Sequence, residues 1–210
     1  MNRNLANHNS NSLNPSLIAA QVNKVAASHC NAWDFKVFDR GKHSGWSPPT
    51  PPNVKVNFDA AVGPNESYLA AVCCDHNAKI LGVWSDFCAS SDPLIAEARA
   101  ALLAVKKMKE EGFKWVCFEG DSLIVSQAIQ GLSHAQFWTI DCIIAEIRSI
   151  LPFFSFWLVS HVCRDFNSVA HSVAQWVAAC KVRGTISISS IPVHLFEQRA
   201  EGDGSSAASF

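Results

Sequence analysis

Residues 92–112, DPLIAEARAALLAVKKMKEEG, carry the clearest secondary-structure signal in this chain of 210 residues. Asp92 is a suitable N-cap, Pro93 suits the first helical position, and Gly112 suits the C-terminal stop. Between them apolar side chains recur at helical spacing and form one stripe, which comprises Leu94, Ala98, Ala101, Leu102, Val105 and Met108. This pattern predicts a long amphipathic helix with one face against a core.

Three strand-like segments precede this helix. In VKVNFD, residues 54–59, apolar and polar side chains alternate at the period of a strand with one buried face, which places Asp59 on the polar face. The next two segments are YLAAVCCD (68–75) and KILGVWSDFCA (79–89), and the turn-forming HNA joins them. We therefore expect a first strand followed by a β-hairpin.

Strands and helices alternate after the helix. KWVCFEGD (114–121) predicts a strand that ends at Gly120 and Asp121, and helical segments follow at 122–131 and 138–151. FFSFWLVSHV (153–162) predicts a fifth strand, and Asn167 is a suitable N-cap for a last helix over 167–181. The order β-β-β-α-β-α-α-β-α predicts an α/β fold: a five-stranded mixed sheet, antiparallel on one side and parallel on the other, flanked by helices.

The segments outside this pattern differ in composition. Residues 1 to about 50 are rich in Asn and Ser and end in a proline cluster, and the chain closes on GDGSSAASF. We therefore expect a poorly ordered leader and Pro-rich linker (1–52), one domain (53–182) and a flexible C-terminal tail (183–210).

Charge and cysteine content limit the class of protein. The net charge of −1 and a pI near 6.7 argue against a strongly basic surface, so any contact with nucleic acid must be local. Eight cysteines without a CxxC pair suggest buried, reduced thiols and no zinc site. No apolar run approaches the length of a membrane span. We expect an intracellular monomer, nuclear or cytoplasmic, with no membrane partner.

Three carboxylates stand where burial would be costly without a bound cation: Asp59 in the first strand, Glu97 in the long helix and Asp121 after the fourth strand. Mg²⁺ prefers oxygen ligands, and two such ions roughly 3.5–4 Å apart can promote phosphodiester hydrolysis. Each residue also has an ordinary explanation. Asp59 could be a surface strand residue, Glu97 a helix former, and Asp121 the N-cap of a helix that begins at Ser122.

Four segments, in this order and at this spacing, resemble the type 1 ribonuclease H domain: KVNFDAAV (55–62), PLIAEARAALLAV (93–105), VCFEGDSLIVSQAI (116–129) and HVCRDFNSVAHSVAQ (161–175). The resemblance covers about Trp46 to Lys181. It is closest to the plant version in LINE-type retrotransposon polyproteins, because WSPPTPPNVKVNFDAAV (46–62) matches the Pro-rich entry to their first strand.

The resemblance implies a five-stranded RNase H-like fold and cleavage of the RNA strand of an RNA–DNA hybrid with Mg²⁺ or Mn²⁺. The hybrid would be recognised by its backbone and its ribose 2′-OH groups, and not by base sequence. Asp59, Glu97 and Asp121 match three of the family's catalytic, metal-binding carboxylates. NSVAH (167–171) places His171 at the position of the fourth carboxylate, and His134 lies where some members carry a mobile histidine.

The histidine at the fourth position weakens the implied metal site, because imidazole is a poor ligand for Mg²⁺ and carries no negative charge. We therefore expect weaker binding of one ion. A catalytically degenerate module that binds nucleic acid, or is only inherited, remains the first alternative. A second alternative is a GDSL-type esterase, since EGDSL (119–123) resembles that family's nucleophile block, with Ser122 as nucleophile, His171 as base and Asp165 as its partner.

Overall fold

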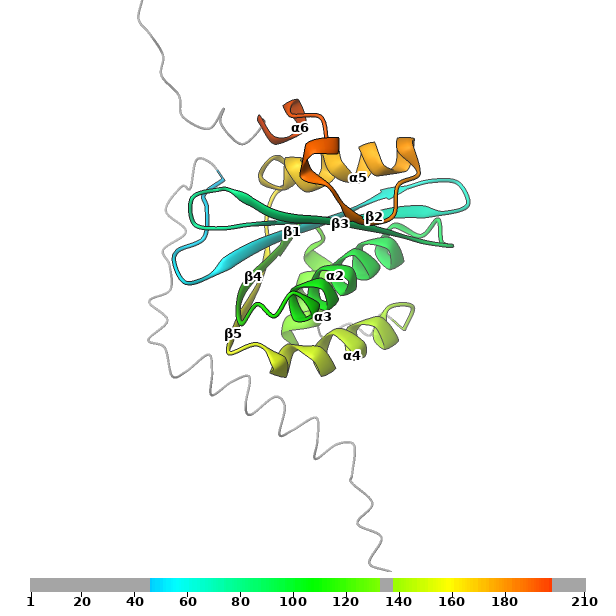
Figure 1. The fold of residues 1–210 in the computed structure, drawn as a ribbon. Helices are drawn as coiled ribbons and strands as arrows, with labels where there is room; N and C mark the ends of the chain where they lie inside the picture. The colour runs from blue at the N-terminus through cyan, green and yellow to red at the C-terminus, as the bar shows by residue number, and fades with distance from the viewer. Residues whose placement is uncertain (1–45, 133–137, 198–210) are drawn as a thin grey trace, which may run out of the picture. The chain divides into compact units, whose positions relative to one another are not determined.

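The computed structural model describes residues 46–132 and 138–197, which form a mixed sheet with helices on both faces (Figure 1). The strands are β1 (Val54–Val62), β2 (Ser67–Cys74), β3 (Ile80–Cys88), β4 (Trp115–Gly120), β5 (Phe156–His161) and β6 (Gly184–Ile186). The helices are α2 (Pro93–Glu110), α3 (Leu123–Gln130), α4 (Asp141–Ile150), α5 (Ser168–Cys180) and α6 (His194–Glu197). Short 3₁₀ turns are η1 (Leu151–Phe153), η2 (Arg164–Asn167) and η3 (Ile188–Ser190). The predicted α/β class and order of elements through α5 are confirmed.

The strands lie in the order β5-β4-β1-β2-β3-β6. The neighbouring pairs β1–β2, β2–β3 and β3–β6 are antiparallel, whereas the pairs β1–β4 and β4–β5 are parallel. The predicted number of five strands is wrong, because β6 pairs with β3. Its three residues are too few to show the alternation that identifies a strand. β6 begins beyond residue 182, and the division into leader, domain and tail stays a prediction.

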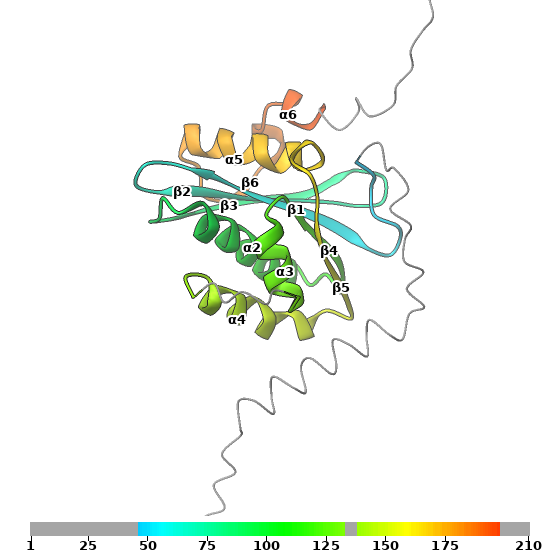
Figure 2. The same cartoon turned by 180° about the vertical axis from the view of Figure 1, so that it is seen from behind.

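Helix α2 begins as its sequence predicts. The side chain of Asp92 accepts hydrogen bonds from the backbone N–H groups of Leu94 and Ile95, and Pro93 is the first helical residue. Gly112, with φ +78°, reverses the chain after the helix. α2, α3 and α4 lie on one side of the sheet (Figures 1 and 2), where the larger core forms.

Helix α5 covers the opposite face of the sheet, on β1 and β2 (Figure 1). A second, smaller core forms there, in which Val169, Val173 and Val177 of α5 belong with side chains of β2 and β3. Because helices cover both faces of β1, the predicted exposure of its polar face is wrong. Of its polar side chains, Lys55 is 7%, Asn57 2% and Asp59 2% exposed.

The cysteines are less uniformly buried than the sequence predicts. Cys73 and Cys74 are buried in β2, whereas Cys142, Cys163 and Cys180 are exposed. The two in helices, Cys142 and Cys180, are on the solvent sides of α4 and α5. Within residues 46–132 and 138–197, no helix has both the length and the apolar character needed to cross a membrane.

Candidate active site

The three predicted carboxylates converge at one place. Asp59 comes from β1, Glu97 from α2, and Asp121 directly follows β4. One carboxylate oxygen from each lies within 4.8 Å of the other two. The fold brings them together because β1 and β4 are parallel neighbours and α2 packs on β1.

This cluster concentrates negative charge in a poorly hydrated place. Burial raises the pKa of Asp59, and the charge of Asp121 raises it further, while the hydrogen bond from His171 opposes both. Burial, followed by the charges of Asp59 and Asp121, raises the pKa of Glu97 to about 9. Two unit charges 4.8 Å apart repel by roughly 3 kcal/mol at an effective dielectric constant of about 20. The folded cluster therefore favours a proton or a cation.

The donor set fits a hard divalent cation. It offers three carboxylates, and Oε2 of Glu97 is buried without a hydrogen-bond partner among the described residues. An orphaned buried carboxylate oxygen is costly, and a cation held between the three groups would remove that cost. Oxygen ligands of this kind suit Mg²⁺ or Mn²⁺.

Asp121 is not the N-cap of the helix that follows it. Helix α3 begins at Leu123, and Oγ of Ser122 accepts the capping hydrogen bond from the backbone N–H of Val125 at 3.4 Å. The N-cap interpretation of Asp121 is therefore wrong. Its carboxylate instead lies beside those of Asp59 and Glu97.

Gly120 and Phe58 fix the spacing of the two strands that carry the aspartates. A Cβ atom on Gly120 would overlap the ring of Phe58, and both residues are buried. Each is the immediate neighbour of a site aspartate, Asp121 and Asp59. The absence of a side chain at position 120 thus allows the two carboxylates to approach.

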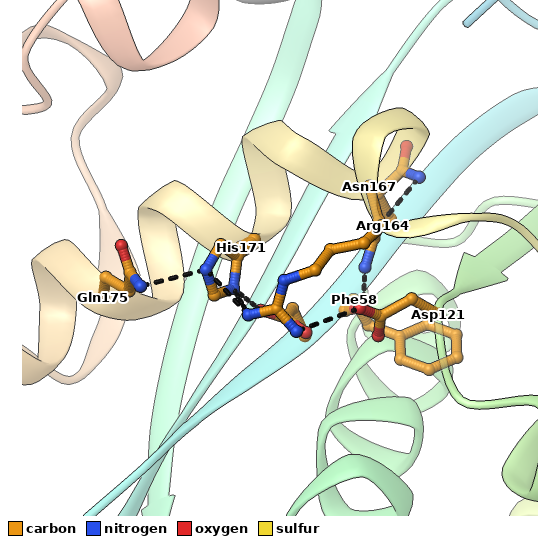
Figure 3. Close-up of polar contacts among 8 residues, drawn as sticks. Phe58, Asp121, Arg164, Asn167, His171 and Gln175 are labelled. Carbon is orange, nitrogen blue, oxygen red and sulfur yellow. Dashed lines mark hydrogen bonds and ion pairs between the residues drawn. The ribbon is translucent and has the colours of Figure 1, made fainter.

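His171 approaches Asp59 from α5, on the face of the sheet opposite to α2, which carries Glu97. Its Nδ1 is 2.7 Å from Oδ2 of Asp59, and its Nε2 is 2.9 Å from Nε2 of Gln175 and 3.0 Å from Nη2 of Arg164. The guanidinium of Arg164 extends on toward Asp121, with Nη1 3.7 Å from Oδ2 (Figure 3). Sequence reasoning missed Arg164 and Gln175. The spacing of Gln175, four residues after His171 on one helix, could have indicated it.

A buried network of polar side chains also escaped sequence reasoning. Asn167 precedes α5 as predicted, but its side chain makes no capping hydrogen bond. Its Nδ2 donates to the carbonyl of Phe58 at 3.0 Å, and its Oδ1 accepts from Asn57 at 3.2 Å. Asn57 Nδ2 also lies 3.2 Å from Glu119, which pairs with Lys55 at 2.8 Å. The network ties η2 and β4 to the part of β1 that carries Asp59.

The serine, histidine and aspartate expected for an esterase do not form their expected contacts. Ser122 caps α3, His171 bonds Asp59 in place of Asp165, and Asp165 is exposed in η2. No hydrogen bond joins Ser122 to His171 within the described part of the chain. His134 falls at 133–137, outside the described residues.

Comparisons with known proteins agree with this fold. The chain is similar to RNase H1 from the halophilic archaeon Halobacterium salinarum (23% identity, TM-score 0.57), over 62% of this chain and 99% of that one. It is similar to the N-terminal RNase H domain of a Mycobacterium tuberculosis protein (16% identity, TM-score 0.56), over 61% and 96% of the two chains. It is also similar to LC11-RNase H1, which was solved in complex with an RNA/DNA hybrid (18% identity, TM-score 0.54), over 61% and 99%.

No curated protein sequence matches the chain. At these identities the solved structures establish the RNase H-like fold alone. A family model described as reverse transcriptase-like matches residues 57–177, which is more than half of the chain and includes the elements that carry the three carboxylates. The chain therefore belongs to the reverse transcriptase-like family.

Proposed function

We propose that this domain binds nucleic acid and hydrolyses the RNA strand of RNA–DNA hybrids with the help of a divalent metal ion. The observation that carries the proposal is the convergence of Asp59, Glu97 and Asp121 within 4.8 Å in a chain of this family. The hybrid bound to the structurally similar LC11-RNase H1 supports the substrate class. The Pro-rich entry to β1 supports an origin in LINE-type retrotransposon polyproteins of plants.

The three carboxylates are the proposed catalytic residues and would hold Mg²⁺ or Mn²⁺. Such an ion supplies Lewis-acid stabilisation of the negative charge that develops on the phosphate during hydrolysis. Glu97, with its pKa raised to about 9, would release its proton on binding the ion. Asp59 is oriented by His171 from one side and by the bond from Asn167 to the carbonyl of Phe58. His171 stands at the family's fourth position, and its role as a ligand stays a prediction.

Contact with the hybrid would be local, since the chain has a net charge of −1. The side chain of Arg164 is 66% exposed beside the carboxylates, where it could approach a phosphate. We assign recognition to the sugar–phosphate backbone and the ribose 2′-OH groups. The active unit would be a monomeric domain over about residues 53–182, and β6, which follows it in sequence, adds an edge strand to its sheet.

A second candidate is a degenerate module that binds nucleic acid without cleaving it. The position of His171 favours it, because an imidazole replaces a carboxylate and its nitrogens already have partners. In that case the three remaining carboxylates would not support hydrolysis at a useful rate.

A gel assay with an end-labelled RNA–DNA hybrid tests the proposal, with Mg²⁺ or Mn²⁺ and with duplex DNA as the substrate control. Asp121→Asn and a chelator should each abolish cleavage. Asp165→Asn removes an exposed carboxylate from η2 and should leave cleavage unchanged. Folded protein that binds the hybrid by fluorescence anisotropy without cutting it would support the degenerate module instead.

A further inference from the structure

Residues 164–175 supply His171 and two of its polar partners, Arg164 and Gln175 (Figure 3). Arg164 precedes α5, and His171 and Gln175 lie within it. These groups lie where the resemblance implies a fourth carboxylate. Their contacts determine what that side of the site can bind.

The partners of the His171 ring fix which nitrogen carries its proton. Nη2 of Arg164 lies 3.0 Å from Nε2 and 3.3 Å from Nδ1, so this contact alone does not decide which nitrogen carries a proton. A carboxylate can only accept, so Nδ1, 2.7 Å from Oδ2 of Asp59, carries a proton and donates it. The amide of Gln175 lies 2.9 Å from Nε2. Nδ1 then has no lone pair for a metal ion, and the lone pair of Nε2 lies on the side of Gln175 and Arg164.

Arg164 brings a permanent positive charge to the same side. Its guanidinium bridges His171, at 3.0 Å from Nη2, and Asp121, at 3.7 Å from Nη1. An arginine remains charged at any physiological pH. A second cation that approached Asp59 from this side would meet a guanidinium and an imidazole N–H in place of the oxygen ligands it needs.

We propose that Arg164 and His171 replace the second metal ion with a cation of the protein, so that the three carboxylates bind a single divalent ion. His171 is then a positioning residue for Asp59 and not a ligand. This inference rests on the metal site proposed above. If Arg164 occupies the place of a second ion, its removal should change the number of ions bound, and the next experiment measures that number.

The first test counts the ions bound to the full chain by isothermal titration calorimetry with Mn²⁺ alone. The count for the site is the difference between the unaltered chain and Asp59→Asn, and we expect one ion. The double variant Arg164→Ala/His171→Asp should bind two. His171→Asp alone should still bind one, because Arg164 would pair with the new carboxylate. Arg183→Ala, which removes an exposed arginine that packs on Phe87, should bind one.

Removal of Arg164 alone should tighten binding of the single ion by about 5-fold, because one nearby positive charge is lost from a partly exposed place. Two ions in the unaltered chain would overturn the inference and leave the proposed metal site standing. A double variant that still bound one ion would also overturn it. No difference between the unaltered chain and Asp59→Asn would instead overturn the metal site itself, and this inference with it.

A second measurement reads the His171 ring without reference to activity. Nitrogen-15 NMR of the imidazole should show the Nδ1–H form, and this form should persist when Mg²⁺ is added. A ring protonated on Nε2, or one that loses the Nδ1 proton when Mg²⁺ binds, would overturn the positioning role.

Discussion

Nδ1 of His171 lies 2.7 Å from Oδ2 of Asp59, a residue that is only 2% exposed. The bond joins α5 to β1 across 112 residues of sequence. Helix α5 also packs on the sheet through apolar side chains, with Val169, Val173 and Val177 in the smaller core. A contact within the candidate active site therefore also contributes to the packing of the last long helix.

Replacement of His171 by Ala should lower the free energy of unfolding by about 1–3 kcal/mol, because it removes the side-chain donor of a buried carboxylate. Urea denaturation monitored by tryptophan fluorescence would measure the change. Gln175→Ala is the control, since it removes an exposed partner of the same ring and should cost less than about 0.5 kcal/mol. Equal losses in the two variants would contradict a specific role for the bond to Asp59.

Glu97 should make stability fall as pH rises. Between its ordinary pKa of 4.5 and its raised pKa of about 9, the folded protein holds a proton that the unfolded chain has released. Each pH unit in this window then costs the folded state up to about 1.4 kcal/mol in metal-free protein. Denaturation midpoints from pH 5 to 9 should decline for the unaltered chain and decline much less for Glu97→Gln.

The matched control for this pH profile is Glu110→Gln, which alters an exposed glutamate at the end of the same helix. It should retain the full decline. A profile for Glu97→Gln that parallels that of the unaltered chain would show that another group carries the pH dependence.

Gly120→Ala should destabilise the domain by about 1–3 kcal/mol, because its Cβ would overlap the buried ring of Phe58. Gly112→Ala meets open space and should cost only about 1 kcal/mol for its positive φ. A double-mutant cycle with Phe58→Leu would identify the cause. The smaller side chain should relieve part of the cost of Gly120→Ala, whereas strictly additive losses would exclude the overlap as its origin.

The pair formed by Lys55 and Glu119 should matter far more than a pair on the surface. Their side chains are 9% and 13% exposed, so Lys55→Met would leave a carboxylate with little access to water and should cost about 2–4 kcal/mol. Lys106→Met, which breaks an equally short pair with Glu146 whose side chains are 45% and 44% exposed, should cost about 0–1 kcal/mol. Chemical denaturation of both variants gives the comparison, and similar losses would contradict it.

Local signals predicted much of this molecule. The cap at Asp92, the apolar stripe of α2 and the order of strands and helices are properties of neighbouring residues, and the structure retains them. The positions of Asp59 and Asp121 in the chain followed from the strands that precede or contain them. Their convergence with Glu97 was expected from an ordered set of motifs, because no single carboxylate distinguishes itself by its own sequence context.

The missed features depend on partners that are distant in sequence. Asn167 has the type and position of an N-cap, yet the carbonyl of Phe58, 109 residues away, takes its amide hydrogen. The burial of Asn57 and Asp59 required knowledge that α5 covers the second face of β1. Arg164 could not be placed until η2 was positioned against the carboxylates.

Strand β6 also protects the antiparallel margin of the sheet. It pairs with Val83, Trp84 and Ser85, whose strand would otherwise present unpaired backbone groups to solvent at that edge. Unpaired edges of this kind promote strand addition between molecules and aggregation. A chain shortened after Val182 would lose this cover while keeping every side chain of the candidate active site. Its solubility and its chemistry would then be affected separately, so poor yield of such a shortened chain would carry no information about catalysis.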